Sequence, residues 1–166
     1  MKKVNSYAVA LMMMVMCALC VACGSEGNTI ILGTYNETNS TFTEVPSSLG
    51  YSIEVDGETI TLNGTIPYSA GVLGIQAGNI VAIKIIPNAT YEADDETYVK
   101  TTNRNDPSGW NTYDKTAIEE DGSVIWVTSV SKENTVQIKI KWNEDVEEIT
   151  YTLEVDDSAT LNTSAS

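Results

Sequence analysis

The side chains best suited to holding a ligand by stacking and hydrogen bonding gather in one stretch of this sequence. Residues 103–114 read NRNDPSGWNTYD, so Trp110 and Tyr113 lie among turn-forming residues and not in an alternating strand. Their rings offer rigid contact area, and Asn111 offers hydrogen bonds to hydroxyl groups. This mixture predicts a site for a sugar or a peptide at Trp110, Asn111 and Tyr113. The alternative is that Trp110 is a lid over the end of the core.

The remaining candidates for chemistry are carboxylates, which occur in runs at residues 92–96, 119–121, 144–148 and 156–157. Calcium takes six to eight oxygen ligands from acidic loops, but none of these runs has the spacing of an EF-hand. A solvated surface is therefore the main interpretation, and a weak calcium site is the alternative. Nothing in the pattern places two carboxylates across one cleft, as glycoside hydrolysis requires. We expect no metal, no cofactor and no enzymatic activity, with a small hydrolase as a remote alternative.

The residue types that are missing exclude several classes of protein. The 166 residues include no His, which excludes Ser-His-Asp and Cys-His catalysis and imidazole metal sites. The three cysteines are Cys17, Cys20 and Cys23, so nothing after residue 23 can form a disulfide framework or act as a thiol nucleophile. The net charge is −14. A surface this acidic repels the phosphate backbone, and we expect no nucleic-acid partner.

The first 23 residues, MKKVNSYAVALMMMVMCALCVAC, have the layout of an export signal. Lys2 and Lys3 form a positive start, an uncharged apolar run follows, and Ala22 precedes Cys23. The last five residues, Leu19 to Cys23, resemble the lipobox of bacterial lipoproteins. This resemblance implies cleavage before Cys23 and a lipid group on its thiol, so Cys23 would anchor the protein to a membrane through acyl chains. It covers only the signal and implies nothing about the domain that follows.

Two alternatives to this anchor remain open. The first is an uncleaved membrane anchor, although the apolar run from Tyr7 to Cys23 is shorter than the roughly 20 residues that span a bilayer. Ordinary secretion is the second. With lipidation, we expect a protein held by its lipid at the cell membrane or outer membrane, on the extracytoplasmic side. Because both Lys2 and Lys3 precede the cleavage point, the mature chain would have a net charge of −16.

The chain after residue 23 alternates as β-strands do. Apolar residues recur with a period of two in four segments, and two further segments are almost continuously apolar, as buried strands are. Gly, Asn and Asp separate these segments, and no convincing amphipathic helix follows residue 23. The alternating segments are 51–55, 60–62, 135–142 and 147–155; the apolar ones are 79–86 and 123–130. The pattern predicts an all-β protein, an antiparallel β-sandwich with immunoglobulin-like Greek-key topology.

The same pattern divides the chain into four parts. We expect a signal peptide at 1–22, a lipidated tether with an edge strand at 23–50, the β-sandwich at 51–157 and a flexible tail at 158–166. Trp142 and Trp126 have strand phases that bury them in the core. Lys84 has apolar neighbours on both sides, and we expect its side chain to reach solvent. The alternative for Lys84 is an isopeptide cross-link.

The function that this organisation favours is a surface lipoprotein whose sandwich is a non-enzymatic binding or adhesion module, with a glycan or a protein as ligand. A structural or accessory subunit of a cell-envelope complex is the alternative.

Overall fold

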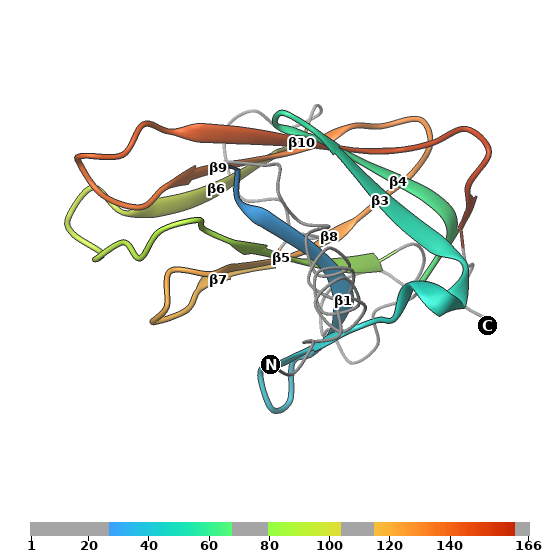
Figure 1. Cartoon of the computed structure of the whole chain (residues 1–166), viewed down its shortest axis with the longest axis horizontal. Helices are drawn as coiled ribbons and strands as arrows, with labels where there is room; N and C mark the ends of the chain where they lie inside the picture. Colours follow the sequence, from blue (N-terminus) through green and yellow to red (C-terminus); the bar gives the residue numbers. More distant parts are fainter. Residues whose placement is uncertain (1–26, 68–79, 104–114, 162–166) are drawn as a thin grey trace, which may run out of the picture.

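The computed structural model describes residues 27–67, 80–103 and 115–161 of the chain. Within these ranges the chain forms β-strands, turns and one short 3-10 helix, η2 (Ser47–Leu49), and it contains no α-helix. The strands lie in two sheets that face each other as two layers, and the apolar faces of both sheets meet between them (Figure 1). This arrangement confirms the prediction of an all-β sandwich.

The first sheet has the strand order β2-β1-β5-β8-β7, and every neighbouring pair in it is antiparallel. Its strands are β1 (Thr29–Asn36), β2 (Thr41–Glu44), β5 (Ile80–Ile86), β7 (Lys115–Ile118) and β8 (Val124–Ser129). β5 and β8 lie at its centre and are apolar on both faces. Ile80, Ala82, Ile125 and Val127 on the outer face are buried, with Tyr35 and Phe42 packed against them.

The second sheet contains both parallel and antiparallel pairs. Its order is β11-β4-β10-β9-β6, and β3 also pairs with β4. β4 runs parallel to β10 and β11, whereas the other neighbours are antiparallel. Its strands are β3 (Tyr51–Asp56), β4 (Thr59–Ile66), β6 (Tyr98–Asn103), β9 (Val136–Lys141), β10 (Ile149–Val155) and β11 (Thr160–Leu161).

The core follows from the alternation of these strands, because every second side chain points between the sheets. Val136, Ile138 and Ile140 of β9 are buried, while Gln137 is exposed. Trp126 is 0% exposed and Trp142 is 2% exposed, which confirms that both tryptophans belong to the core. The buried apolar residues form one continuous cluster between the sheets and a smaller one on the outer face of the first sheet.

The parallel pairs of β4 with β10 and β11 depart from the antiparallel sandwich that was expected, and three further features differ from the expectations. β1, expected at a sheet edge, lies between β2 and β5. Residues 158–161, expected in a flexible tail, continue the fold: Ala159 is buried and β11 pairs with the end of β4. β4 also continues through Gly64 to Ile66, beyond the alternating segment 60–62 seen in the sequence. Gly64 has φ +77°, and a Cβ there would lie 2.1 Å from the Gly50 carbonyl oxygen, so only glycine fits this close approach.

Lys84 reaches the edge of the outer face, where its Nζ lies 2.5 Å from Oε2 of Glu119. In the described part of the chain, no helix has the length and apolar character needed to cross a membrane.

Candidate functional site

The residues singled out in the sequence lie outside the described ranges. Trp110, Asn111 and Tyr113 fall between the end of β6 at Asn103 and the start of β7 at Lys115, and Cys23 precedes the first described residue. Asn103 pairs with Val136 at the start of β9, so β6 meets the undescribed stretch at the end of the sandwich where β9 begins. The ligand site and the lipid-attachment site expected from the sequence therefore stay predictions.

A large cavity lined by described residues is at the opposite end, where β9 ends and β10 begins. It is an open groove of about 720 Å³ between the start of β1 and the second sheet. This volume lies in the range of small-molecule and peptide sites. Its lining comes from four separate stretches of the chain: Gly27, Asn28, Thr29 and Ile30; Val55, Gly57 and Glu58; Asn88 and Tyr91; Ile149 and Tyr151.

Val55 explains why the groove is open. It has the same strand phase as Tyr51 and Ile53, which point toward the core, yet 48% of its surface is exposed. Val55 lies near the end of β3, which pairs only with β4 among the described strands and is therefore an edge strand. A core-phase side chain is thereby left as one wall of the groove. Ile30 and Ile149 are half-buried and add to its apolar surface.

Polar side chains fix the start of β1 in place beside the groove. Nδ2 of Asn28 donates to the hydroxyl of Tyr151 at 2.5 Å, and Oδ1 of Asn28 accepts from the backbone N–H of Asn88 at 3.1 Å. Asn28 therefore joins β1, the β5–β6 loop and β10, although the sequence placed it in a tether. Burial raises the pKa of the Tyr151 hydroxyl above its usual range, so this group stays neutral at physiological pH.

Tyr91 forms the side of the groove toward the β5–β6 loop. Its hydroxyl donates to Oδ1 of Asn88 at 3.4 Å, and its ring packs against Trp142 with centroids 5.3 Å apart and a tilt of 36°. Trp142 is fixed in turn, because its indole N–H donates to the carbonyl of Gly122 at 2.7 Å. The Tyr91 ring thus rests on a rigid part of the core and presents a fixed surface for contact.

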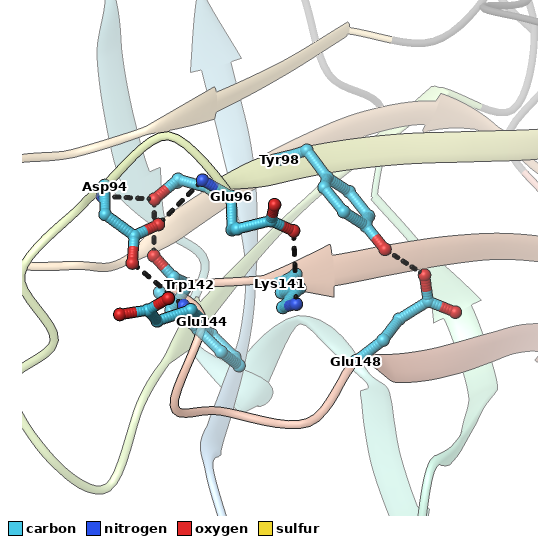
Figure 2. A network of polar contacts seen from close by, with 8 residues as sticks. Asp94, Glu96, Tyr98, Lys141, Trp142, Glu144 and Glu148 are labelled. Atoms are coloured by element: carbon cyan, nitrogen blue, oxygen red, sulfur yellow. Dashed lines mark hydrogen bonds and ion pairs between the residues drawn. The ribbon is translucent and has the colours of Figure 1, made fainter.

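Three acidic loops meet at this end of the sandwich: residues 87–97, 119–123 and 142–148. Together they carry nearly half of the 23 carboxylates in the sequence. The Trp142 indole links the second and third loops through Gly122, and Asn143 Nδ2 links the third to the first by donating to the Glu92 carbonyl at 3.1 Å. Figure 2 shows the remaining contacts between the first and third loops.

Asp94 is the centre of those contacts. Its carboxylate accepts 2.8 Å hydrogen bonds from the backbone N–H groups of Glu96 and Glu144, one in each loop (Figure 2). The bond from Glu144, more than any other contact, holds the pKa of Asp94 below its usual range. The Thr97 hydroxyl donates to the Trp142 carbonyl, and the Tyr98 hydroxyl donates to Glu148. The acidic loops are therefore held rigidly although their side chains are exposed.

The charges around the groove limit what it can bind. Glu58 is the single ionisable carboxylate among the described lining residues, and those residues include no Lys or Arg. An anion would meet no cationic side chain among these described residues, whereas neutral polar and cationic groups meet tyrosine hydroxyls, asparagine amides and one carboxylate. Among the described residues, no group of three or more Cys, Asp or Glu side chains is placed to hold a metal ion.

Sequence reasoning missed this groove because its polar residues have no shared motif. Asn28 lies in a short polar stretch and Asn88 in a chance glycosylation sequon, while Tyr151 alternates with core residues. One signal was available. An asparagine immediately before a strand and a tyrosine within a buried face both need partners, and pairing them would have indicated a contact between the two ends of the chain.

The comparisons with known proteins add no family to this description. No protein-family model matches the chain, and no curated protein and no solved structure matches it.

Proposed function

We propose that the protein is a lipid-anchored surface protein whose β-sandwich binds a glycan or protein ligand without catalysing a reaction. The observation that carries the binding role is the groove of about 720 Å³, in which an inward-phase valine is 48% exposed. Uncovered apolar surface beside oriented hydroxyl and amide groups is typical of a ligand site. The lining has one carboxylate and no second acid–base partner among the described residues, which favours binding over hydrolysis.

The anchor is proposed on the sequence. The charged start, the apolar run and Ala22-Cys23 resemble a lipoprotein signal, which makes Cys23 the lipid-attachment residue and places the domain outside the cytoplasm. Only residues 24–27 separate Cys23 from Asn28, a span of at most about 18 Å. Since Asn28 lines the groove, the groove would lie close to the membrane surface.

We also infer an immunoglobulin-like Greek key for the strands. If β5 to β10 are named B to G in chain order and β1 is named A, the two sheets contain A-B-E-D and G-F-C. This is the order of immunoglobulin constant domains, with β2, β3, β4 and β11 as additions. The β5–β6 and β9–β10 loops would then be the B–C and F–G loops, which bind antigen in variable domains. This analogy supports a binding role at the groove end but does not identify a ligand.

The test starts from the full chain purified in detergent and a glycan array together with envelope extract. Any captured molecule is purified and titrated by calorimetry against wild type, Val55→Glu and the near-isosteric control Val55→Thr. We expect at least about a tenfold loss of affinity for Val55→Glu, equivalent to about 1.4 kcal/mol, because a charge enters the apolar wall, and little change for Val55→Thr.

Trp110→Ala separates the groove from the site expected in the sequence. If Trp110→Ala abolishes binding at an unchanged melting temperature while Val55→Glu does not, the ligand site is at residues 110–113 and the groove proposal is wrong.

A further inference from the structure

The first strand of the sandwich is paired along only part of one edge. β5 pairs with β1 from Thr29 to Gly33, whereas β2 pairs with its other edge only from Gly33 to Asn36. Toward the start of β1, the last backbone hydrogen bond on this second edge is donated by the Val45 N–H to the Leu32 carbonyl at 3.2 Å. Over residues 29–31, no strand in the described ranges pairs with the edge of β1 that faces away from β5.

The hydrogen-bond phase places the backbone of Ile30 on this open edge. In an antiparallel strand, successive residues direct their N–H and C=O groups to alternate sides. The Leu32 carbonyl points toward β2, so the N–H and C=O of Ile30 point to the same side, away from β5. The side chain of Ile30 lines the groove together with Thr29. One residue thus offers the groove a backbone donor, a backbone acceptor and an apolar side chain.

We propose that the groove binds an extended peptide, which adds as a strand beside the first half of β1 and continues the line of β2. This proposal rests on the proposed binding function and specifies its ligand. Strand addition draws affinity from main-chain hydrogen bonds and specificity from pockets for alternate side chains. Ile30 supplies the main-chain groups, and Val55, Ile149 and Tyr151 form the apolar surface that receives alternate side chains.

The charges define the composition of the peptide. Glu58 lines the groove, and Glu92 and Glu148 directly follow or precede the lining residues Tyr91 and Ile149. A net charge of −14 attracts cationic segments and repels acidic ones. We therefore expect a segment of about four to six residues in which apolar β-branched or aromatic side chains alternate with Lys, Arg or neutral polar residues. At about 3.3 Å per residue, three residues of this segment would lie along the open stretch of β1, residues 29–31.

The experiment selects peptides from a display library of random 12-residue sequences, using the full chain in detergent as bait and Val55→Glu as a counter-selection. We expect selected peptides to share the alternating apolar and basic pattern. Each is then resynthesised with a single N-methyl group at successive backbone positions. Methylation at one or two alternate positions should weaken binding at least tenfold, because it removes the N–H that pairs with Ile30, while the intervening positions should tolerate it.

Two variants of the protein give the matching test. Ile30→Pro removes the open-edge N–H but leaves the bonds to β5, which come from Thr29, Ile31 and Gly33; Ile30→Ala removes only the side chain. We expect Ile30→Pro to lose at least tenfold more affinity than Ile30→Ala, with both melting temperatures checked. If Ile30→Pro does not fold, the N-methyl series on unaltered protein decides alone.

The outcomes separate this inference from the proposed function. Selected peptides that tolerate methylation everywhere would overturn strand addition. The absence of Val55-sensitive peptides, combined with a glycan whose binding is weakened by Val55→Glu, would overturn the peptide ligand and leave the binding function standing. If neither peptides nor glycans bind in a way that Val55→Glu weakens, the binding function of the groove is overturned as well.

Discussion

Replacing Trp142 tests whether the end of the sandwich beneath the groove is held as we describe. Trp142 is 2% exposed, its indole N–H donates to the Gly122 carbonyl at 2.7 Å, and its ring supports Tyr91. An aromatic side chain buries about 150–250 Å². At about 25 cal/mol per Å², the transfer contribution is about 4–6 kcal/mol, and measured Trp→Ala losses are about 3–5 kcal/mol. We therefore expect Trp142→Ala to lower the free energy of unfolding by about 4 kcal/mol.

Trp142→Phe separates packing from hydrogen bonding. Phenylalanine keeps most of the apolar contact but leaves the Gly122 carbonyl without its donor, so we expect a loss of about 1–2 kcal/mol. Lys141→Ala is the control on the polar face of the same strand. Its Nζ lies 3.4 Å from a carboxylate oxygen of the exposed Glu96, and such pairs contribute about 0–1 kcal/mol.

The assay is urea unfolding of the chain without residues 1–23, followed by far-UV circular dichroism, because fluorescence would change with the substituted ring. The slope of free energy against urea should stay constant if only stability changes. Equal losses for Trp142→Ala and Lys141→Ala would refute the assigned strand phase, and a Trp142→Phe loss as large as that of Trp142→Ala would show that packing against Tyr91 is unimportant.

Three further predictions concern the anchor, the acidic loops and the backbone. Cys23→Ala should abolish labelling by a clickable palmitate analogue, and unchanged labelling would point to Cys20 or Cys17 instead. Asp94 has a pKa held below its usual range by backbone N–H donors, so its stabilising effect is complete above the unfolded value of about 3.9 and is lost as the pH falls through the folded value. Melting temperatures measured between about pH 7 and 2 should therefore fall more steeply for wild type than for Asp94→Asn, and parallel curves would contradict the role of Asp94. Gly64→Ala should lower the free energy of unfolding by more than about 3 kcal/mol, because the added Cβ meets the Gly50 carbonyl. Gly57→Ala, where φ is +58° and the space is open, should lower it by only about 1 kcal/mol. Similar unfolding curves for the two variants would show that the contact with Gly50 relaxes.

The period-two pattern identified β3, β4, β9 and β10 because burial on one face leaves a direct trace in the sequence. Thr135 to Trp142 alternates cleanly, and the structure buries Val136, Ile138, Ile140 and Trp142 as that pattern predicts. The continuous apolar run at β5 correctly indicated a strand covered on both faces. The pairing of the strands, by contrast, could not be predicted from the sequence. Nothing local in β1 indicates that it lies between β2 and β5, because a partner is chosen by contacts distant in sequence.

The groove could not be predicted for the same reason. Val55 has the phase of a core residue, and its 48% exposure depends on which strands pack around the edge strand β3, which the sequence of β3 does not encode. Asn28 and Tyr151 meet only once both sheets have formed, and they lie at the two ends of the domain sequence. Sequence reasoning favoured Trp110 and Tyr113 because aromatic residues in a polar stretch are conspicuous locally, whereas the groove is made by tertiary structure.

The parallel pairing of β4 with β10 has a consequence for how the protein acquires its structure. The β3–β4 hairpin and the β9–β10 hairpin can each close locally, but the second sheet joins them only through residues 59–62 and 152–155. Contacts this distant in sequence make folding slow and cooperative, because the loop entropy is lost before the contact is gained. A chain that crosses a membrane from its N-terminus cannot complete this sheet until β10 has emerged, so most of the polypeptide would cross unfolded and fold in a single late step.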